Sequence, residues 1–507
     1  MSMAHSQEEI KGKSLVKLAE ELEASTREAA QARKSLYEVE KDTFGYVLRI
    51  GYAAIEQVLM LQGDGNLGES VFTEDGRRLE RSEEPAERPL RTVFGEHTIR
   101  AYVYAAGSHE AIELRPVDAR LSLPAGCCSY FFEEFSQYFC VDQAFGQASR
   151  GLATVLHQKV SVNTLEHINR RMGGQAEGFL DELPTPPAKK EGELLVFTAD
   201  GKGVPLVKED AKRVPAFDKV ERPGNRRMAT LAAVYTINPY VRAPEQILAA
   251  LFRDERGPQP KDRPQPQFKH VTARFTSMRE DPDGERWESN GTIEAFIWAD
   301  EQIAARRRLG QKLLRLMDGQ ASLWDTADNY LNVPAEDIID ILDILHTSSY
   351  VWKAAKVFYS DWEHREAFAR DRLLRILQGD VRGVIGGLRQ MATKRGLKGD
   401  RLKQITTVCG YFEKHAHRMR YDEYLAAGYP IASGVIEGAC RHLVKDRMER
   451  SGMRWRLVGA QAMLHVRAVY QSSYWDNFHK DRIAREQCKL HPHRALLNDY
   501  HPIILAG

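Results

Sequence analysis

The feature that most constrains this chain is a short apolar run that leads into an acidic residue and two glycines. Glu193–Val204 reads ELLVFTADGKGV. The apolar part, Leu194–Phe197, is too short for a helix and predicts a buried strand. The glycines after Asp200 predict that the strand ends in a sharp turn there. Such a strand would place a carboxylate at the edge of a sheet, where open α/β sheets bind their ligands. The alternative is a solvated turn aspartate.

Length and composition narrow the class of protein. The chain has 507 residues, of which 43% are hydrophobic and 28% charged, so we expect a globular protein of two to four domains. It holds no apolar run of about 18 residues, and we expect no membrane span. The first residues, MSMAHSQEEIKGK, do not resemble a secretion signal. Six scattered cysteines without C-x-x-C spacing favour reduced thiols in a cytoplasmic protein and no zinc module.

Charge is balanced over the chain but not along it. Lys and Arg total 72 against 71 Asp and Glu, which by itself argues against a nucleic-acid partner. Between Asp380 and Gly459, however, basic residues outnumber acidic ones by about two to one. A local basic excess of this kind is typical of phosphate-binding surfaces.

The N-terminal third combines helices with a β-hairpin. Glu8–Gln62 has helical periodicity and predicts packing helices or a dimer face. Gly63–Gly68 matches G-x-G-x-x-G, but it follows a predicted helix and leads into a mostly polar stretch, Glu69–Arg88, so it is interpreted as a loop. Thr92–Leu114 alternates in polarity around a turn signal and predicts a hairpin.

Two predicted helices follow. Phe145–Leu156 and Val162–Met172 are separated by a tight turn, and the second ends in Arg170 and Arg171. The pair fits a helix-turn-helix or an ordinary helical hairpin, and the residues alone do not separate the two.

The remainder begins after the Pro/Lys-rich linker Leu183–Glu193. Met228–Ile237 predicts a strand beside the first one. Lys312–Asp318 is a second apolar run that ends in an aspartate, and Asp337–Leu345 predicts a third strand or a helix start. Trp362–Tyr424 is helical in pattern and basic.

Three acidic residues stand out in this half of the chain. Asp200 and Asp318 each follow an apolar strand and precede a glycine, and Glu437 lies at a predicted helix start. If the two strands are neighbours, their carboxylates meet at one edge, where a helix could add Glu437. Clustered carboxylates suit Mg²⁺ or Mn²⁺, and two such ions about 3.5–4 Å apart act in phosphoryl transfer. Repulsion between the carboxylates would leave such a site inert in chelator.

Five segments carry a resemblance to a known family. They are TADGKG (Thr198–Gly203), LMDGQASLW (Leu316–Trp324), ILDILHTSSYVWKAA (Ile341–Ala355), SGVIEGACRHLVKDRMERSGMRW (Ser433–Trp455) and WDNFHKDR (Trp475–Arg482). They resemble segments of bacterial insertion-sequence transposases of the ISKra group, which is similar to the Mutator-like DDE transposases. The resemblance extends over roughly residues 92–482, and its most specific part is Ser433–Trp455.

The resemblance implies an α/β fold with an RNase H-like catalytic core and an all-α insertion, preceded by a mainly helical region with a helix-turn-helix. Asp200, Asp318 and Glu437 match the metal-binding triad, which would hold two Mg²⁺ or Mn²⁺ ions. Asp343 and His346 match an Asp-x-x-His element. His346 then contacts flanking DNA, orients a metal ligand or makes a structural hydrogen bond, and Asp343 is the main rival of Asp318 as second triad member.

The same resemblance divides the chain into five segments. They are a helical oligomerisation region (1–75), a hairpin and helix-turn-helix region for DNA binding (90–182), the first part of the core (193–350), the helical insertion (351–430) and the C-terminal part of the core with a basic helix (431–507). Related transposases often carry cysteine pairs near Tyr102–Pro116, and this chain has none there.

Candidate DNA contacts are basic residues near the triad and on the two basic helices. They are Lys202, Arg226, Arg227, Arg441, Lys445, Arg447, Arg450, Arg170 and Arg171. The helix-turn-helix is the candidate reader of terminal inverted repeats.

The sequence therefore predicts a DNA transposase that cuts the ends of an insertion sequence and joins them to target DNA. Its partners would be double-stranded DNA and further copies of the chain, because two ends must be cut together. It would be cytoplasmic and associated with the bacterial nucleoid. The alternatives are a domesticated, non-catalytic DNA-binding regulator and an RNase H-fold nuclease specific for branched DNA.

Overall fold

The computed structural model describes residues 14–107, 110–214, 224–254, 263–280, 284–450 and 452–502. Contacts divide the chain into two compact units. Unit 1 comprises Met1–Arg171 and Trp475–Gly507, and unit 2 comprises Met172–Tyr474. The C-terminal residues thus belong with the N-terminal ones, a grouping that the five predicted segments do not contain. Among the described helices, none combines the length and the apolarity that crossing a membrane requires.

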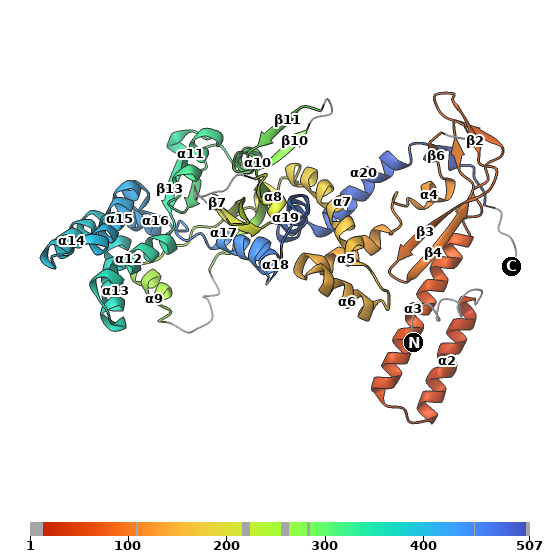
Figure 1. Ribbon diagram of the computed structural model, residues 1–507, viewed down its shortest axis with the longest axis horizontal. Coiled ribbons are helices and arrows are strands. Elements are labelled where there is room, and N and C mark those ends of the chain that lie inside the picture. Colours follow the sequence, from red (N-terminus) through yellow and green to blue (C-terminus); the bar gives the residue numbers. More distant parts are fainter. Residues whose placement is uncertain are drawn as a thin grey trace. The chain divides into compact units, whose positions relative to one another are not determined.

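Unit 1 begins with two helices that lie side by side, α2 (Leu15–Gln31) and α3 (Leu36–Met60) (Figure 1). Ser14 and Ser35 cap them by accepting backbone N–H groups of the first turn. The predicted helical region is therefore confirmed over the part that the structure describes.

The β-structure of unit 1 differs from the predicted hairpin. A four-stranded sheet has the order β1 (Ser70–Phe72), β2 (Arg78–Arg81), β5 (Tyr104–Ala105) and β6 (Ile112–Leu114), and β3 (Ala86–Thr92) pairs with β4 (Gly95–Ala101). Within the predicted hairpin Thr92–Leu114, β5 and β6 pair antiparallel, whereas β4 turns back onto β3 through a two-residue connection. Gly63–Gly68 is a loop, as predicted, and the polar stretch after it contains β1, β2 and the start of β3.

The helices of unit 1 include the predicted pair. They are α4 (Pro116–Leu121), α5 (Tyr130–Asp142), α6 (Phe145–Val155), the first half of α7 (Val162–Asp181), α20 (Trp475–Leu490) and the short η5 (Arg494–Leu497). Helix α7 continues nine residues beyond its predicted end at Met172. Gly173 lies inside this helix. A Cβ there would come within 2.4 Å of Ala462, so glycine is needed for this close approach.

Unit 2 is built on a mixed five-stranded sheet. Its strands are β7 (Leu194–Pro205), β8 (Arg226–Ile237), β9 (Gln267–Phe275), β12 (Leu313–Met317) and β13 (Ile338–Leu342), in the order β13-β12-β7-β8-β9. Strands β7, β8 and β9 are antiparallel, and β12 and β13 run parallel to β7. A separate hairpin joins β10 (Ser277–Glu280) and β11 (Arg286–Ser289).

Strand β7 is longer than predicted, and Asp200 lies within it instead of ending it. Strand β8 pairs with β7 continuously from Leu194 to Pro205. This pairing satisfies the backbone N–H and C=O groups beyond Asp200, so the chain stays extended instead of turning. A Cβ at Gly201 would lie 2.7 Å from the Met228 Cε, so this glycine makes room for a cross-strand neighbour.

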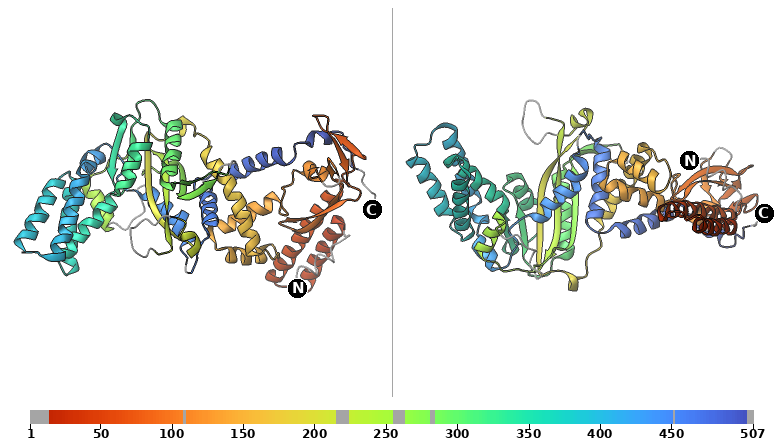
Figure 2. Two further views of the ribbon diagram at one scale, coloured as in Figure 1. Left: turned by 45° about the horizontal axis from the view of Figure 1, so that its top comes forward. Right: turned by 90° about the horizontal axis from the view of Figure 1, so that it is seen from below.

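Helices cover both sides of this sheet and extend beyond it. They are α8 (Lys208–Ala211), α9 (Pro244–Phe252), α10 (Gly291–Arg306), α11 (Ala321–Tyr330), α12 (Ile344–Phe358), α13 (Trp362–Leu377), α14 (Val381–Lys394), α15 (Gly399–His415), α16 (Tyr421–Ala426), α17 (Gly434–Ala439), α18 (Asp446–Met448) and α19 (Leu457–Gln471), with single turns η1 (Ala188–Lys190), η2 (Ala335–Asp337) and η3 (Ala416–Arg418). A π-helical stretch, η4 (Cys440–Lys445), joins α17 to α18. Helices α12 to α16 all contribute buried residues to one apolar cluster. Figures 1 and 2 show these helices grouped together.

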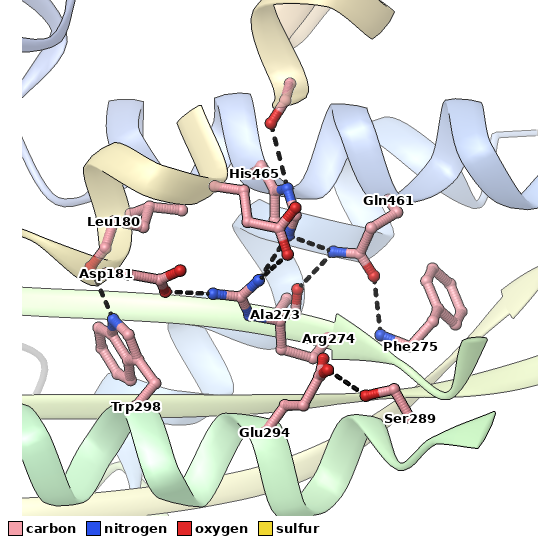
Figure 3. Close-up of polar contacts among 12 residues, drawn as sticks. Leu180, Asp181, Ala273, Arg274, Phe275, Ser289, Glu294, Trp298, Gln461 and His465 are labelled. Carbon is pink, nitrogen blue, oxygen red and sulfur yellow. Dashed lines mark hydrogen bonds and ion pairs between the residues drawn. The ribbon is translucent and has the colours of Figure 1, made fainter. Parts of the chain in front are cut away.

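Figure 3 shows how the second half of α7 is fixed to the sheet of unit 2. Helices α10 and α19 lie on opposite sides of β9. Arg274 on β9 is buried and forms ion pairs with Glu177 at 2.7 Å and Asp181 at 2.6 Å. The Trp298 indole N–H of α10 donates to the Leu180 carbonyl at 2.8 Å. These contacts satisfy polar groups that would otherwise be costly to bury.

Candidate functional site

Three aspartates belong to three neighbouring strands, with Asp200 inside β7 and Asp318 and Asp343 directly after β12 and β13. Strands β7 and β12 pair with an offset of 118 residues (Leu195 with Leu313), which is also the offset from Asp200 to Asp318. Strands β12 and β13 pair with an offset of 25 residues, which is the offset from Asp318 to Asp343. Continuing the register therefore places the three aspartates beside one another, on strands about 4.8 Å apart.

Asp200 is held by two donors. Its Oδ1 accepts the Gly201 backbone N–H at 2.7 Å, and its Oδ2 accepts the Cys440 thiol at 3.3 Å. Burial raises the pKa of Asp200, and the nearby Asp318 carboxylate raises it further, whereas the hydrogen bond from Cys440 lowers it. Without a cation, this site therefore disfavours the charged form of Asp200.

Asp343, His346 and Glu437 form a second part of the same site. Asp343 caps α12 through the Leu345 N–H at 2.9 Å, and its other oxygen accepts the Ser433 hydroxyl. One ligand atom from each of Asp343, His346 and Glu437 lies within 4.8 Å of the other two, close enough for a shared cation. Burial raises the pKa of Glu437. The negative charges of Asp343 and Asp200 raise this pKa further, whereas His346 lowers it.

Asp318 is braced by the helical insertion. The Trp324 indole N–H donates to the Asp318 carbonyl at 2.6 Å, and the Arg418 guanidinium lies 3.9 Å from the centroid of the Trp324 ring. The Tyr411 ring covers Gly319, where a Cβ would meet it at 2.3 Å. Residues 411 and 418 are two helical turns apart and so lie on one side of α15 and the turn after it. The insertion thus contacts the loop that carries the second aspartate.

The candidate DNA contacts differ in exposure. Arg226, Arg441, Lys445 and Arg170 are exposed, whereas Lys202, Arg450 and Arg171 are half-buried. Lys202 lies two residues beyond Asp200 on β7 and therefore projects to the same side of the sheet.

Two of the candidate contacts are buried. Arg227 donates to the backbone carbonyls of Val214, Gly224 and Arg226, because strand alternation turns it away from the solvent that Arg226 faces. Arg447 packs on the Trp455 ring with its guanidinium 4.9 Å from the centroid. The π-helical stretch η4 interrupts the regular helix between Arg441 and Arg447. Neither guanidinium is placed to meet DNA phosphate.

Sequence reasoning missed three residues that hold the carboxylates. Ser433 and Cys440 lie four residues before and three residues after Glu437, so a helix start there puts them near one another. That spacing was a usable signal for both. Tyr411 had none, because its contact with Gly319 joins segments that are 92 residues apart.

Comparison with known proteins adds no relative. A scan against protein-family models found no match, and no curated protein matches the chain significantly.

Removing one buried charge is expected to stabilise the metal-free protein. The raised pKa of Asp200 means that the folded chain holds this proton more tightly than the unfolded chain does. The contribution of Asp200 to the free energy of unfolding therefore falls as pH rises from about 4, the unfolded carboxyl pKa, through the raised native pKa. In chelator at pH 7, Asp200→Asn should raise Tm, by about 2–4 °C for each kcal/mol of relieved repulsion.

The difference should shrink as pH falls below about 4, because the carboxyl then becomes neutral in both the folded and the unfolded chain. Asp325→Asn is a matched control, because Asp325 is exposed on the nearby helix α11. Calorimetry over this pH range checks the prediction, and a lower Tm for Asp200→Asn at pH 7 would contradict it.

Proposed function

We propose that this protein is a DNA transposase with an RNase H-like catalytic core. In unit 2, β7, β8 and β9 pair antiparallel, and β12 and β13 add in parallel on the other side of β7. This topology is the one expected of that core. Helices α13 to α16 lie between Asp343 and Glu437, where the all-α insertion is expected.

The observation that carries the proposal is the common level of Asp200, Asp318 and Asp343, with Glu437 within reach of the last. Carboxylate oxygens from neighbouring strands are the donors that Mg²⁺ and Mn²⁺ prefer, so this donor set fits such ions. When bound, two ions would activate the attacking oxygen and stabilise the leaving one.

The protein's own residues orient these donors and bind the strand. The Gly201 N–H and the Cys440 thiol fix both oxygens of Asp200, and the α15 contacts hold the loop of Asp318. Lys202 and the exposed residues Arg226, Arg441 and Lys445 are suited to bind backbone phosphates around the reacting one. Asp200, Asp318 and Glu437 are proposed as the triad, with Asp343 and His346 as accessory residues. No covalent protein–DNA intermediate is needed, because water or a DNA hydroxyl is the nucleophile.

Helices α6 and α7 are proposed to read the terminal inverted repeats. They occupy the positions of the predicted helix-turn-helix, and Arg170 is exposed on α7. Two DNA ends must be cut together, so a dimer or larger assembly is part of the proposal.

The test is a cleavage and strand-transfer assay on DNA that carries the element's own ends. We expect cleavage with Mg²⁺ or Mn²⁺, none in chelator, and joined products with target DNA. Cleavage of branched DNA without joining would replace the proposal with a structure-specific nuclease. Specific binding of the ends without cleavage under any metal condition would replace it with a DNA-binding regulator.

A further inference from the structure

A pocket in unit 2 lies one helical turn from Glu437. It has a volume of about 430 Å³, within the range of small-ligand sites. Its walls come from the end of β8, the chain before β9 and the segment that leads into α17. Gly434 and Val435 line it, and Glu437 follows Gly434 by three residues, a rise of about 4.5 Å along a helix. One wall of the pocket therefore lies close to Glu437. Its β8 wall lies farther from the carboxylates, because Ile237 pairs with Leu194, six residues before Asp200.

Two arginines give this pocket its charge. Arg242 and Arg263 both line it, and none of its described lining residues is acidic. Arg242 donates through Nε and Nη2 to the backbone carbonyls of Tyr240 and Tyr429. No acidic side chain among the described residues acts on its charge. These neutral acceptors orient the guanidinium but leave its positive charge without a counter-charge.

Burial and charge repulsion both act on the guanidinium of Arg242. Burial lowers the pKa of Arg242, and the positive charge of Arg263 lowers it further. Two cations that repel one another in a partly desolvated pocket are stabilised by an anion between them. A guanidinium fork matches a tetrahedral oxyanion in shape and hydrogen bonding.

We propose that this pocket binds a phosphate group. Resting on the proposed function, the phosphate is a backbone phosphodiester of the DNA strand that passes the carboxylate site. Arg242, fixed by its backbone acceptors, and the exposed Arg263 hold the phosphate, and the nearby apolar residues Pro264 and Pro266 face the sugar. The pocket thus holds the strand at a phosphodiester other than the reacting one.

The test measures how DNA affinity depends on salt in the full-length chain. The probe is a duplex with the element's end sequence, and the variants are Arg242→Gln, Arg263→Gln and both together. Each lost phosphate contact lowers the slope of log K against log salt by about 1, so the double variant should lose about 1 and bind about tenfold more weakly in low salt. Arg389→Gln is the control, because Arg389 is exposed and pairs with Glu413 in the insertion.

Arg242→Lys is the control for misfolding. It keeps the positive charge, so the slope of log K against log salt should remain close to that of the wild type. An unchanged slope and affinity in the double variant, with wild-type DNA binding intact, would overturn the pocket alone. If the wild type binds no DNA, the proposed function fails, and calorimetric titration with inorganic phosphate then decides the pocket. Phosphate binding that the double variant loses would support it, with free phosphate as the source. Absence of binding would overturn it.

Discussion

Asp200→Asn is expected to reduce metal-dependent DNA cleavage by about a thousandfold, which corresponds to roughly 4 kcal/mol of transition-state stabilisation. The substitution keeps the size of the side chain and the acceptor for the Gly201 N–H. It removes a negative charge that a cation needs at the row of three aspartates, of which Asp200 is one end. DNA binding should remain, because repulsion between the carboxylates and phosphate also falls.

Companion variants separate the members of the site. Asp318→Asn and Glu437→Gln should lose activity to a similar extent, with DNA affinity measured in parallel. Asp343→Asn should lose less, because Asp343 is proposed as an accessory residue that also caps α12 through the Leu345 N–H. An inactive Asp343→Asn beside an active Asp318→Asn would show that Asp343 is the second ligand. Wild-type activity in Asp200→Asn would refute the site as drawn.

The sequence predicted the strands around this site better than it predicted how they end. The apolar runs before Asp200 and Asp318 are strands, as expected, because short, mainly apolar runs near glycines suit a strand that is buried on both faces. The second run includes Arg315, which is buried in an ion pair with Asp340. The turn after Asp200 was wrong, since a local glycine signal is weaker than pairing with β8 along the whole of β7. Pairing partners lie far away in the sequence, and a turn propensity does not reveal them.

The side-chain environment was less predictable still. An arginine count cannot show that Arg227 and Arg447 turn inward, because this depends on strand alternation and on the irregular π-helical stretch. The contact of Tyr411 with Gly319 depends on the packing of the insertion against the sheet. The charge of a site is therefore easier to predict from sequence than the residues that hold it in place.

The second large effect is expected on thermal stability and involves the segment WDNFHKDR. Its Arg482 is buried on α20 and forms an ion pair with the buried Glu133 of α5, which also pairs with Arg171. Glu133→Ala would leave the Arg482 charge without this partner in a desolvated position. Removing one member of a buried pair costs about 3–5 kcal/mol.

We expect the lower end of that range, about 3 kcal/mol, because Glu486 and Glu134 lie near enough to Arg482 to compensate in part. For a unit of this size the loss corresponds to a fall in Tm of about 6–12 °C. Calorimetry measures the transition, and hydrogen exchange in α5 and α20 assigns it to unit 1.

A double variant tests the physical cause. Glu133→Leu with Arg482→Met removes both charges and retains much of the volume, so it should recover most of the lost Tm. Recovery would show that the cost of the single variant comes from the uncompensated charge of Arg482 and not from a cavity. If the double variant is as unstable as Glu133→Ala, the pair contributes through its packing and its hydrogen bonds to the helices. If Glu133→Ala unfolds at the wild-type temperature, solvent reaches Arg482 more readily than its burial implies.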